Sequence, residues 1–179
     1  LVAVVVAVQG FLGRDLAQGR APPLPVPAVA GAGAGAGEDA PRAAPPAGPV
    51  LVYFWATWCP ICDLQSGAVS RIAADHPVLT VALQSGDAAA VREHLGAAGL
   101  DFPVALDPEG EFAAAWGVRG VPATFVVGPE GAVRFAEQGY RTGPGLRARL
   151  WWARMSTGSS GAGERREGPL PSTTGTPGE

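Results

Sequence analysis

One stretch limits what this chain can fold into more than any other: seven consecutive apolar or aromatic residues, 50–56, followed within three residues by the first of a pair of cysteines. The run is too short for a helix of ordinary length. Its β-branched and aromatic residues are typical of a strand that is buried on both faces of a sheet. The sequence therefore predicts a central strand that ends beside the two cysteines.

The two cysteines are separated by a proline and an isoleucine, and the proline indicates how they are held. Pro60 has a fixed φ near the helical value and no N–H, so it suits the first turn of a helix and places Cys59 at the N-cap. The free N–H groups of Ile61 and Cys62 would then face the Cys59 thiol and favour its thiolate form. Cys62, one turn later, lies within bridging distance on the inner side. We predict a redox-active pair.

Two other interpretations of the pair are weaker. A purely structural disulfide across so small a ring removes little entropy from the unfolded chain, because that gain grows with the logarithm of loop length. A structural zinc site needs four ligands, and the chain contains no cysteine besides these two. We therefore favour the redox interpretation. Two cysteines alone do not decide between a cytosolic and an exported protein.

Composition limits the size of the domain and the kind of partner. The chain has 179 residues with 26 glycines and 18 prolines, which favours one domain with low-complexity ends. Its net charge is −3 and no basic stripe is present, so we expect no binding to nucleic acid. We also expect no cofactor and no bound metal.

The predicted organisation has four parts. Residues 1–20 begin with eight apolar residues, fewer than the roughly 20 that span a membrane, and are interpreted as a partial signal anchor; a buried strand is the alternative. Residues 21–48 are rich in Pro, Ala and Gly and predict a flexible tether. Residues 49–155 form the folded domain. Residues 156–179 are polar and rich in Gly, Ser and Pro, and predict a disordered tail.

Within the domain, strand and helix patterns alternate. Behind the cysteines, Ile61, Leu64, Ala68 and Ile72 recur at helical spacing and predict an amphipathic helix. A strand at 78–83 follows, so strand, helix and strand make a right-handed parallel unit of the α/β class. The remaining predicted elements are a helix capped by Asp87, an extended piece at 102–106, a helix through 116, an antiparallel hairpin of 123–127 with 132–136, and a helix at 143–155.

Two separate motifs carry a resemblance to a known family. Residues 54–62 read Phe-Trp-Ala-Thr-Trp-Cys-Pro-Ile-Cys, and residues 116–125 read Trp-Gly-Val-Arg-Gly-Val-Pro-Ala-Thr-Phe. Over residues 49–153 the chain resembles thioredoxin-like proteins, and within them the TlpA-like, membrane-anchored, exported disulfide oxidoreductases. Residues 84–86 and 139–140 are similar to those of the suppressor-of-copper-sensitivity D (ScsD) branch.

The resemblance implies a thioredoxin fold, in which helices flank a central mixed sheet, with a TlpA-like insertion of a helix and a strand at 87–106. It also implies that Val121–Pro122 is a cis peptide beside the cysteine pair, an uncommon form even before proline. The backbone of Val121 would pair with an extended segment of a partner protein. Trp58, Pro60 and Pro122 would line the same groove. The alternative for Pro122 is an ordinary proline at the start of a strand.

The chain departs from the family pattern at two acidic positions. Cytoplasmic thioredoxins carry a buried acid where this chain has Tyr53, and many TlpA-like reductases carry a glutamate where it has Gln65. An amide cannot accept a proton from the Cys62 thiol. That proton would then pass to water or to Asp63.

The resemblance implies thiol–disulfide exchange with exported or membrane redox proteins through a transient mixed disulfide. It places the protein at the bacterial inner membrane, anchored by its N-terminus, with the domain on the periplasmic or outer face.

One rival is a copper-handling protein that uses the thiols as ligands, although we expect His76 at a helix end and His94 on a solvated helix face. The other is a redox-silent docking module with Trp151 and Trp152 at its surface, of which we expect one in the core.

Overall fold

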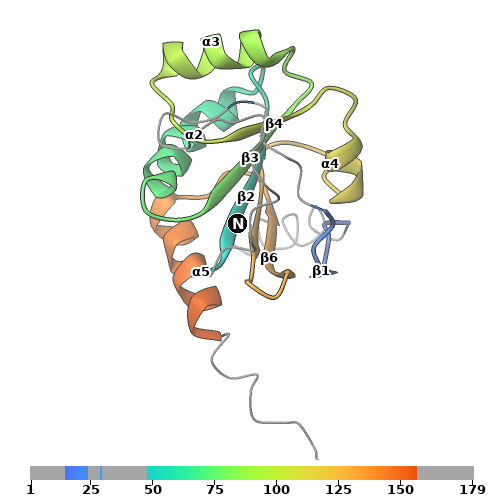
Figure 1. The fold of residues 1–179 in the computed structure, drawn as a ribbon, viewed down its shortest axis with the longest axis vertical. Coiled ribbons are helices and arrows are strands. Elements are labelled where there is room, and N and C mark those ends of the chain that lie inside the picture. Colours follow the sequence, from blue (N-terminus) through green and yellow to red (C-terminus); the bar gives the residue numbers. More distant parts are fainter. Residues whose placement is uncertain (1–14, 24–28, 30–47, 157–179) are drawn as a thin grey trace, which may run out of the picture.

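The computed structural model describes residues 15–23, 29 and 48–156, and its centre is a mixed sheet (Figure 1). Six strands lie in the order β1-β6-β5-β2-β3-β4. β2 is parallel to β3 and β3 to β4, whereas β5 runs antiparallel to both β2 and β6. The strands are β1 (Gly19–Arg20), β2 (Val50–Trp55), β3 (Val78–Leu83), β4 (Val104–Asp107), β5 (Ala123–Val127) and β6 (Ala132–Gln138).

Two of the helices begin where their capping residues predict. The helices are α2 (Pro60–Ala73), α3 (Ala88–Ala98), α4 (Glu111–Ala115) and α5 (Gly143–Ser156). Cys59 is the N-cap of α2 and proline occupies its first turn. The Asp87 carboxylate accepts hydrogen bonds from the N–H groups of Ala89 and Ala90 at the start of α3. These local signals placed both helix starts correctly.

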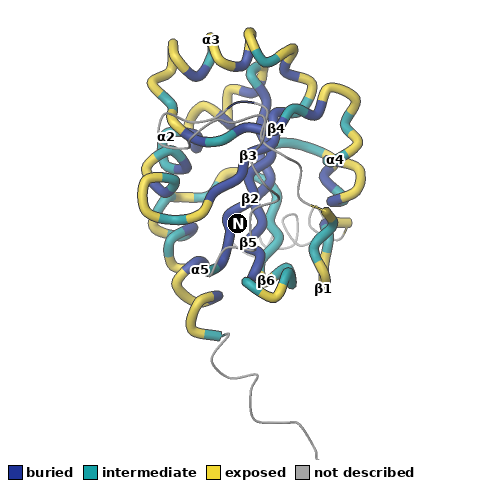
Figure 2. Tube along the Cα trace, viewed as in Figure 1, coloured by how far each residue is buried: buried dark blue, intermediate teal, exposed yellow. Residues whose placement is uncertain are grey.

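The central strands of the sheet are buried (Figure 2), and a cluster of buried side chains lies on each face. Side chains alternate along β2, so Tyr53 and Trp55 join the cluster with residues of α2, α3 and α5, whereas Phe54 points to the other face. There Phe54, Trp116 and Phe125 contact one another with ring centroids 4.8–5.8 Å apart. Every residue of β2 is buried, as expected for a central strand covered on both sides.

The N-terminal part of the chain differs from the expected anchor and tether at two places. Leu16 is buried in the cluster that contains Phe54, and β1 pairs with β6. Val29 forms a bridge to Val104 at the opposite edge of the sheet. Single apolar side chains within a polar or Pro-rich stretch are therefore enough to attach it to the domain. Residues 1–14 and most of 24–47 lie outside the described residues, so the four-part division stays a prediction.

No helix in the described parts of the chain is both long and apolar enough to cross a bilayer. The apolar run at 1–8, which carries the anchor prediction, is outside those parts.

Two expectations about helix faces are wrong. Ile61 and Leu64 are 52% and 74% exposed, because the buried face of α2 is instead the one that continues from Cys62. It consists of Cys62, Gln65, Ser66, Val69 and Ile72. Trp151 and Trp152 of α5 are both exposed, since Leu146, Leu150 and Ala153 already form the inward face of that helix.

An ion pair joins the end of α2 to α5 and makes stability depend on pH. The Arg147 guanidinium donates to the Asp75 carboxylate at 2.6 and 3.0 Å. Hydrogen bonds from Arg147 and His76 lower the Asp75 pKa from 3.8 to about 2. Because the folded pKa is depressed, the stabilisation is present above about pH 4 and is lost as the pH falls through 2.

We expect Asp75→Asn to lower Tm at pH 7 and to lower it much less at pH 2, as measured by circular dichroism. Glu93→Gln, on the exposed side of α3, is the matched control and should change Tm at neither pH. An equal loss at both pH values in the Asp75 variant would contradict the ion-pair explanation.

Candidate redox site

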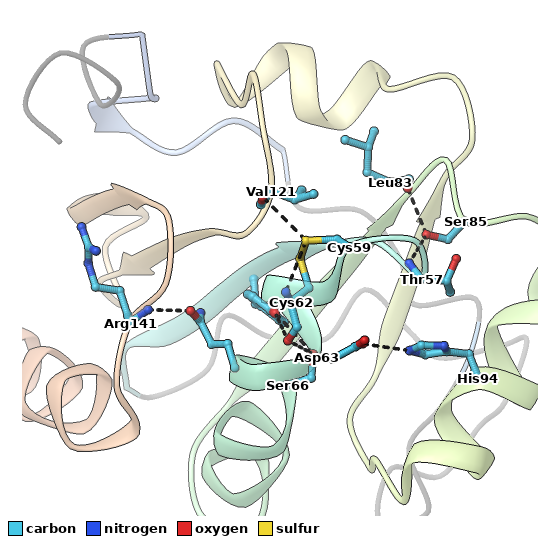
Figure 3. The surroundings of a disulfide bond; sticks show 12 residues. Thr57, Cys59, Cys62, Asp63, Ser66, Leu83, Ser85, His94, Val121 and Arg141 are labelled. Atoms are coloured by element: carbon cyan, nitrogen blue, oxygen red, sulfur yellow. Dashed lines mark hydrogen bonds and ion pairs between the residues drawn. A yellow bond between two sulfur atoms is a disulfide. The ribbon is translucent and has the colours of Figure 1, made fainter. Parts of the chain in front are cut away.

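The centre of the site is a disulfide between Cys59 and Cys62 at the start of α2 (Figure 3). Their Cα atoms are 5.3 Å apart. The N–H of Cys62 points at the Cys59 sulfur, 3.3 Å away. Cys59 is 6% exposed and Cys62 is fully buried. The prediction of an outer sulfur at the helix N-cap and an inner sulfur one turn later is confirmed in its geometry.

The loop before β5 approaches the outer sulfur. Val121–Pro122 is a cis peptide, and the carbonyl oxygen of Val121 lies 3.8 Å from Cys59 Sγ. Pro122 immediately precedes β5, so it is also the strand-start proline of the alternative interpretation. The structure thus brings together two motifs that are about sixty residues apart in sequence.

Trp58 and Pro60 flank Cys59 and are both exposed. The Trp58 indole N–H donates to the Gln84 carbonyl at 3.1 Å, which holds an aromatic side chain with 58% exposure in one orientation. Ser85, in the same turn, accepts a hydrogen bond from the Thr57 N–H at 3.1 Å. The turn after β3 therefore positions the segment that leads to the cysteines, which sequence analysis did not anticipate.

Beneath the disulfide, two hydroxyl groups converge on the Cys62 carbonyl oxygen. Tyr53 Oη lies 3.2 Å from it and Ser66 Oγ lies 2.9 Å from it. The two hydroxyls are also 3.3 Å from each other. Burial raises the pKa of Tyr53 above its ordinary value, although the hydrogen bond with Ser66 opposes that shift. Tyr53 therefore stays protonated near neutral pH and cannot take the place of a buried acid as proton acceptor.

Gln65 is fully buried and holds the chain that leads into α5. Its Oε1 accepts a hydrogen bond of 2.6 Å from the Arg141 N–H. Its Nε2 has no hydrogen-bond partner among the described residues. The sequence already shows an amide here where many TlpA-like reductases carry an acid. It contains no signal for the contact with Arg141, because the two residues are 76 positions apart.

Asp63 and His94 form a second polar pair beside the cysteines (Figure 3). His94 Nε2 lies 3.7 Å from Asp63 Oδ1. The imidazole ring lies against Trp55, with centroids 5.5 Å apart. The expectation of a solvated His94 is therefore wrong. Its position three residues after buried Val91 and next to buried Leu95 was the signal that could have placed it at the edge of the inward face.

With this geometry established, comparison with known proteins decides the family. The model of the Redoxin family matches residues 25–150, which is more than half of the chain. The chain belongs to the Redoxin family.

Individual relatives place this Redoxin among thioredoxin-like proteins. A thioredoxin-like protein of Haemophilus influenzae is 37% identical over 106 residues, which are 59% of this chain and 63% of the relative. The thiol:disulfide interchange protein DsbE of Allochromatium vinosum is 35% identical over 106 residues, which are 56% of this chain and 54% of the relative. The chain thus spans between half and two thirds of the length of these curated relatives.

A solved structure supports the same placement of this Redoxin. The structure of MTB dsbF in its mixed oxidized and reduced forms is 29% identical to it, with a TM-score of 0.54 over 59% of this chain and 81% of the other. The expected thioredoxin fold, with helices flanking a central mixed sheet, is therefore confirmed.

The copper-handling rival requires a third ligand besides the two sulfurs. Among the residues that the structure describes, no three His, Cys, Asp or Glu side chains are close enough to hold a metal ion. His76 pairs with Asp75 at the far end of α2, and His94 faces a single carboxylate. Nothing in this part of the Redoxin chain favours copper over thiol exchange.

Restoring the family glutamate should change how the resolving thiol loses its proton. In Gln65→Glu, a carboxylate oxygen can still accept from the Arg141 N–H, and burial should raise the pKa of the new acid. We expect the rate at which Cys62 resolves a mixed disulfide to gain a dependence on pH near that raised pKa, measured by stopped-flow exchange. Gln65→Met, of similar length but without a proton acceptor, is the control. An identical pH profile in both variants would make the missing acid irrelevant.

Proposed function

We propose that this protein is a protein thiol–disulfide oxidoreductase that acts on exported partner proteins through Cys59 and Cys62. The observation that carries the proposal is the placement of the two sulfurs. One lies at a helix N-cap beside a backbone carbonyl of the cis-proline loop, and the other is sealed beneath it. Relatives named thiol:disulfide interchange proteins support the same activity.

In the reducing direction, the Cys59 thiolate attacks one sulfur of a partner disulfide. A Cys59–partner bond forms, the partner's own disulfide breaks, and its second sulfur leaves as a thiolate that takes up a proton. Cys62 then loses its proton and attacks Cys59 Sγ. The mixed disulfide breaks, the partner leaves fully reduced, and Cys59 and Cys62 are left oxidised. The oxidising direction is the reverse sequence, and two electrons move in either case.

The surface beside Cys59 would hold the partner as an extended segment. The backbone of Val121 supplies hydrogen-bonding groups of the kind that an added strand uses. Trp58 and Pro60 supply exposed apolar surface beside the outer sulfur, whereas Pro122 is buried and would act through the shape of the loop that carries Val121. Such binding depends mainly on main-chain contacts, so it tolerates partners of different sequence.

We further propose the N-terminal anchor, the folded domain, the tail and the location that the sequence predicts; because Leu16 and β1 pack on the domain, residues 21–48 would not separate the domain from the anchor. The apolar start of the chain would be part of a signal anchor in the bacterial inner membrane, and the domain at 49–155 would lie on the periplasmic or outer face. The TlpA-like motifs around the cysteines and Pro122 support this location. The partners would then be exported or membrane redox proteins.

The proposal is tested by equilibrating the full chain with glutathione buffers of defined potential and counting free thiols by mass spectrometry. We expect a reversible two-electron transition of the Cys59–Cys62 pair and, under the same conditions, catalysed reduction or oxidation of a model protein such as insulin. The measured potential gives the preferred direction. A pair that titrates but accelerates no protein exchange would overturn the oxidoreductase assignment.

A further inference from the structure

A short stretch near the start of the described chain packs against the base of the loop that carries the cis-proline. We refer to residues 15–17 as the N-terminal segment and to residues 117–122 as the cis-proline loop. The N–H of Ala17 donates to the Trp116 carbonyl at 2.9 Å, just before the loop begins. A Cβ on Gly117 would overlap the backbone carbonyl of Asp15. The two backbones are therefore in direct contact, and Figure 1 shows β1, which follows the N-terminal segment, beside α4.

Leu16 is the side chain by which the N-terminal segment enters the core. It is 3% exposed and belongs to the buried cluster that also contains Trp116 and Val118, on either side of Gly117. Val121, near the other end of the cis-proline loop, is partly buried and packs against the same cluster. The cluster that Leu16 completes therefore supports the loop at both of its ends.

The cis-proline loop also meets the redox site. The carbonyl oxygen of Val121 lies 3.8 Å from Cys59 Sγ, and Figure 3 shows the two residues side by side. On the side of β6, the Pro122 carbonyl accepts a hydrogen bond of 2.7 Å from the Gly139 N–H. Val121 thus has its side chain against the cluster of Leu16 and its carbonyl at the outer sulfur. A change at Leu16 has a short path to the site, through a single residue.

We propose that Leu16 is a positioning residue, which holds the cis-proline loop in the shape that partner proteins bind. The inference rests on the proposed function, in which the backbone of Val121 pairs with an extended segment of the partner. A loop that is ordered before binding gives higher affinity than one that the partner must order, because its entropy has already been lost. The ion pair of Asp15 with Arg119, at 3.3 Å, is exposed and contributes little to that order. The apolar contact of Leu16 carries the effect.

The test compares full-chain variants in the reduction of insulin with dithiothreitol as electron donor, at a temperature where circular dichroism shows each variant folded. We expect Leu16→Ala to raise the KM for insulin about fivefold and to leave kcat unchanged, because binding is weakened while both sulfurs stay in place. Leu16→Met, of similar volume, should restore the wild-type KM. If Leu16→Ala does not fold, Leu16→Val replaces it and should raise KM by a smaller factor.

Val50→Ala is the matched control for lost packing. Val50 is 7% exposed and belongs to the same cluster as Leu16, but it is the first residue of β2, at the end of the strand away from the cysteines. Val50→Ala should lower Tm without changing KM. Hydrogen exchange followed by mass spectrometry should be faster over residues 117–122 in Leu16→Ala than in Val50→Ala, since only the first variant releases the loop.

The outcomes separate this inference from the proposed function. Wild-type protein that does not accelerate insulin reduction overturns the proposed function and this inference with it. Active wild-type protein whose KM is unchanged in Leu16→Ala overturns the inference alone. An equal rise in KM in Leu16→Ala and Val50→Ala would assign the effect to general loss of stability and would also overturn the inference.

Discussion

Exchange should stop when Cys59 is replaced by serine and should stall halfway when Cys62 is replaced. The outer sulfur is the one beside the Val121 carbonyl, so Cys59→Ser removes the nucleophile and we expect the exchange rate to fall by about a thousandfold or more. Cys62→Ser keeps the nucleophile but removes the group that resolves the mixed disulfide. That variant should accumulate as a covalent adduct with its partner, visible as a slower band on non-reducing gels.

The double variant Cys59→Ser/Cys62→Ser is the control for this experiment, because it preserves the shape of both sites and should form no adduct. Adduct formed in equal amounts by the two single variants would contradict the division of roles. The buried position of Cys62, which is 0% exposed, is the physical reason to expect an asymmetry. A partner disulfide can reach the sulfur at the helix N-cap but not the one beneath it.

Replacing Gly117 with alanine should destabilise the domain by about 3 kcal/mol. Its φ is +68°, where an L side chain costs roughly 1–2 kcal/mol. A Cβ there would also overlap the backbone carbonyl of Asp15. Relief of that overlap requires the segment that carries buried Leu16 to leave the sheet, at a further cost of about 1.5–3 kcal/mol. Urea unfolding of the two proteins, compared at equal m values, measures the difference.

Gly99→Ala separates backbone strain from the steric overlap with Asp15. Gly99 has a φ of +61°, but a Cβ there would meet nothing within 4 Å, so we expect a loss of about 1 kcal/mol from backbone strain alone. Leu16→Ala should cost about 2–3 kcal/mol and should not add fully to Gly117→Ala, since both release the same segment. Equal losses at positions 99 and 117 would show that Asp15 does not pack against Gly117 in solution.

Features that depend on a few neighbouring residues were predictable from the sequence. Pro60 and Asp87 marked the starts of α2 and α3 to the residue, because a cap acts within one turn. The hairpin of β5 and β6 followed from the turn at 128–131 between two β-rich runs, although β6 extends to Gln138, two residues beyond the expected end. The position of the outer and inner sulfurs followed from helix geometry alone.

Which side of a helix is buried depends on the elements that pack against it, and this was not predictable in the same way. The apolar spacing of Ile61 and Leu64 indicated a helix but suggested the wrong inward side, because the buried side of α2 includes polar Gln65 and Ser66. Gln65 finds a hydrogen-bond partner in Arg141, and Ser66 finds one in Tyr53 besides the Cys62 carbonyl of its own helix. Local hydrophobicity cannot report such distant partners.

The contact of Leu16 with the sheet changes what the Pro-, Ala- and Gly-rich stretch can do. Residues 23 and 48, at its two ends, both belong to the described fold, so the stretch connects two points of one body and adds no reach between the domain and a membrane. If residues 1–8 insert into lipid, only residues 9–15 remain as a spacer, and seven extended residues cover at most about 25 Å. Under that arrangement the folded domain stays within roughly its own diameter of the bilayer, and partner proteins would have to come to it there.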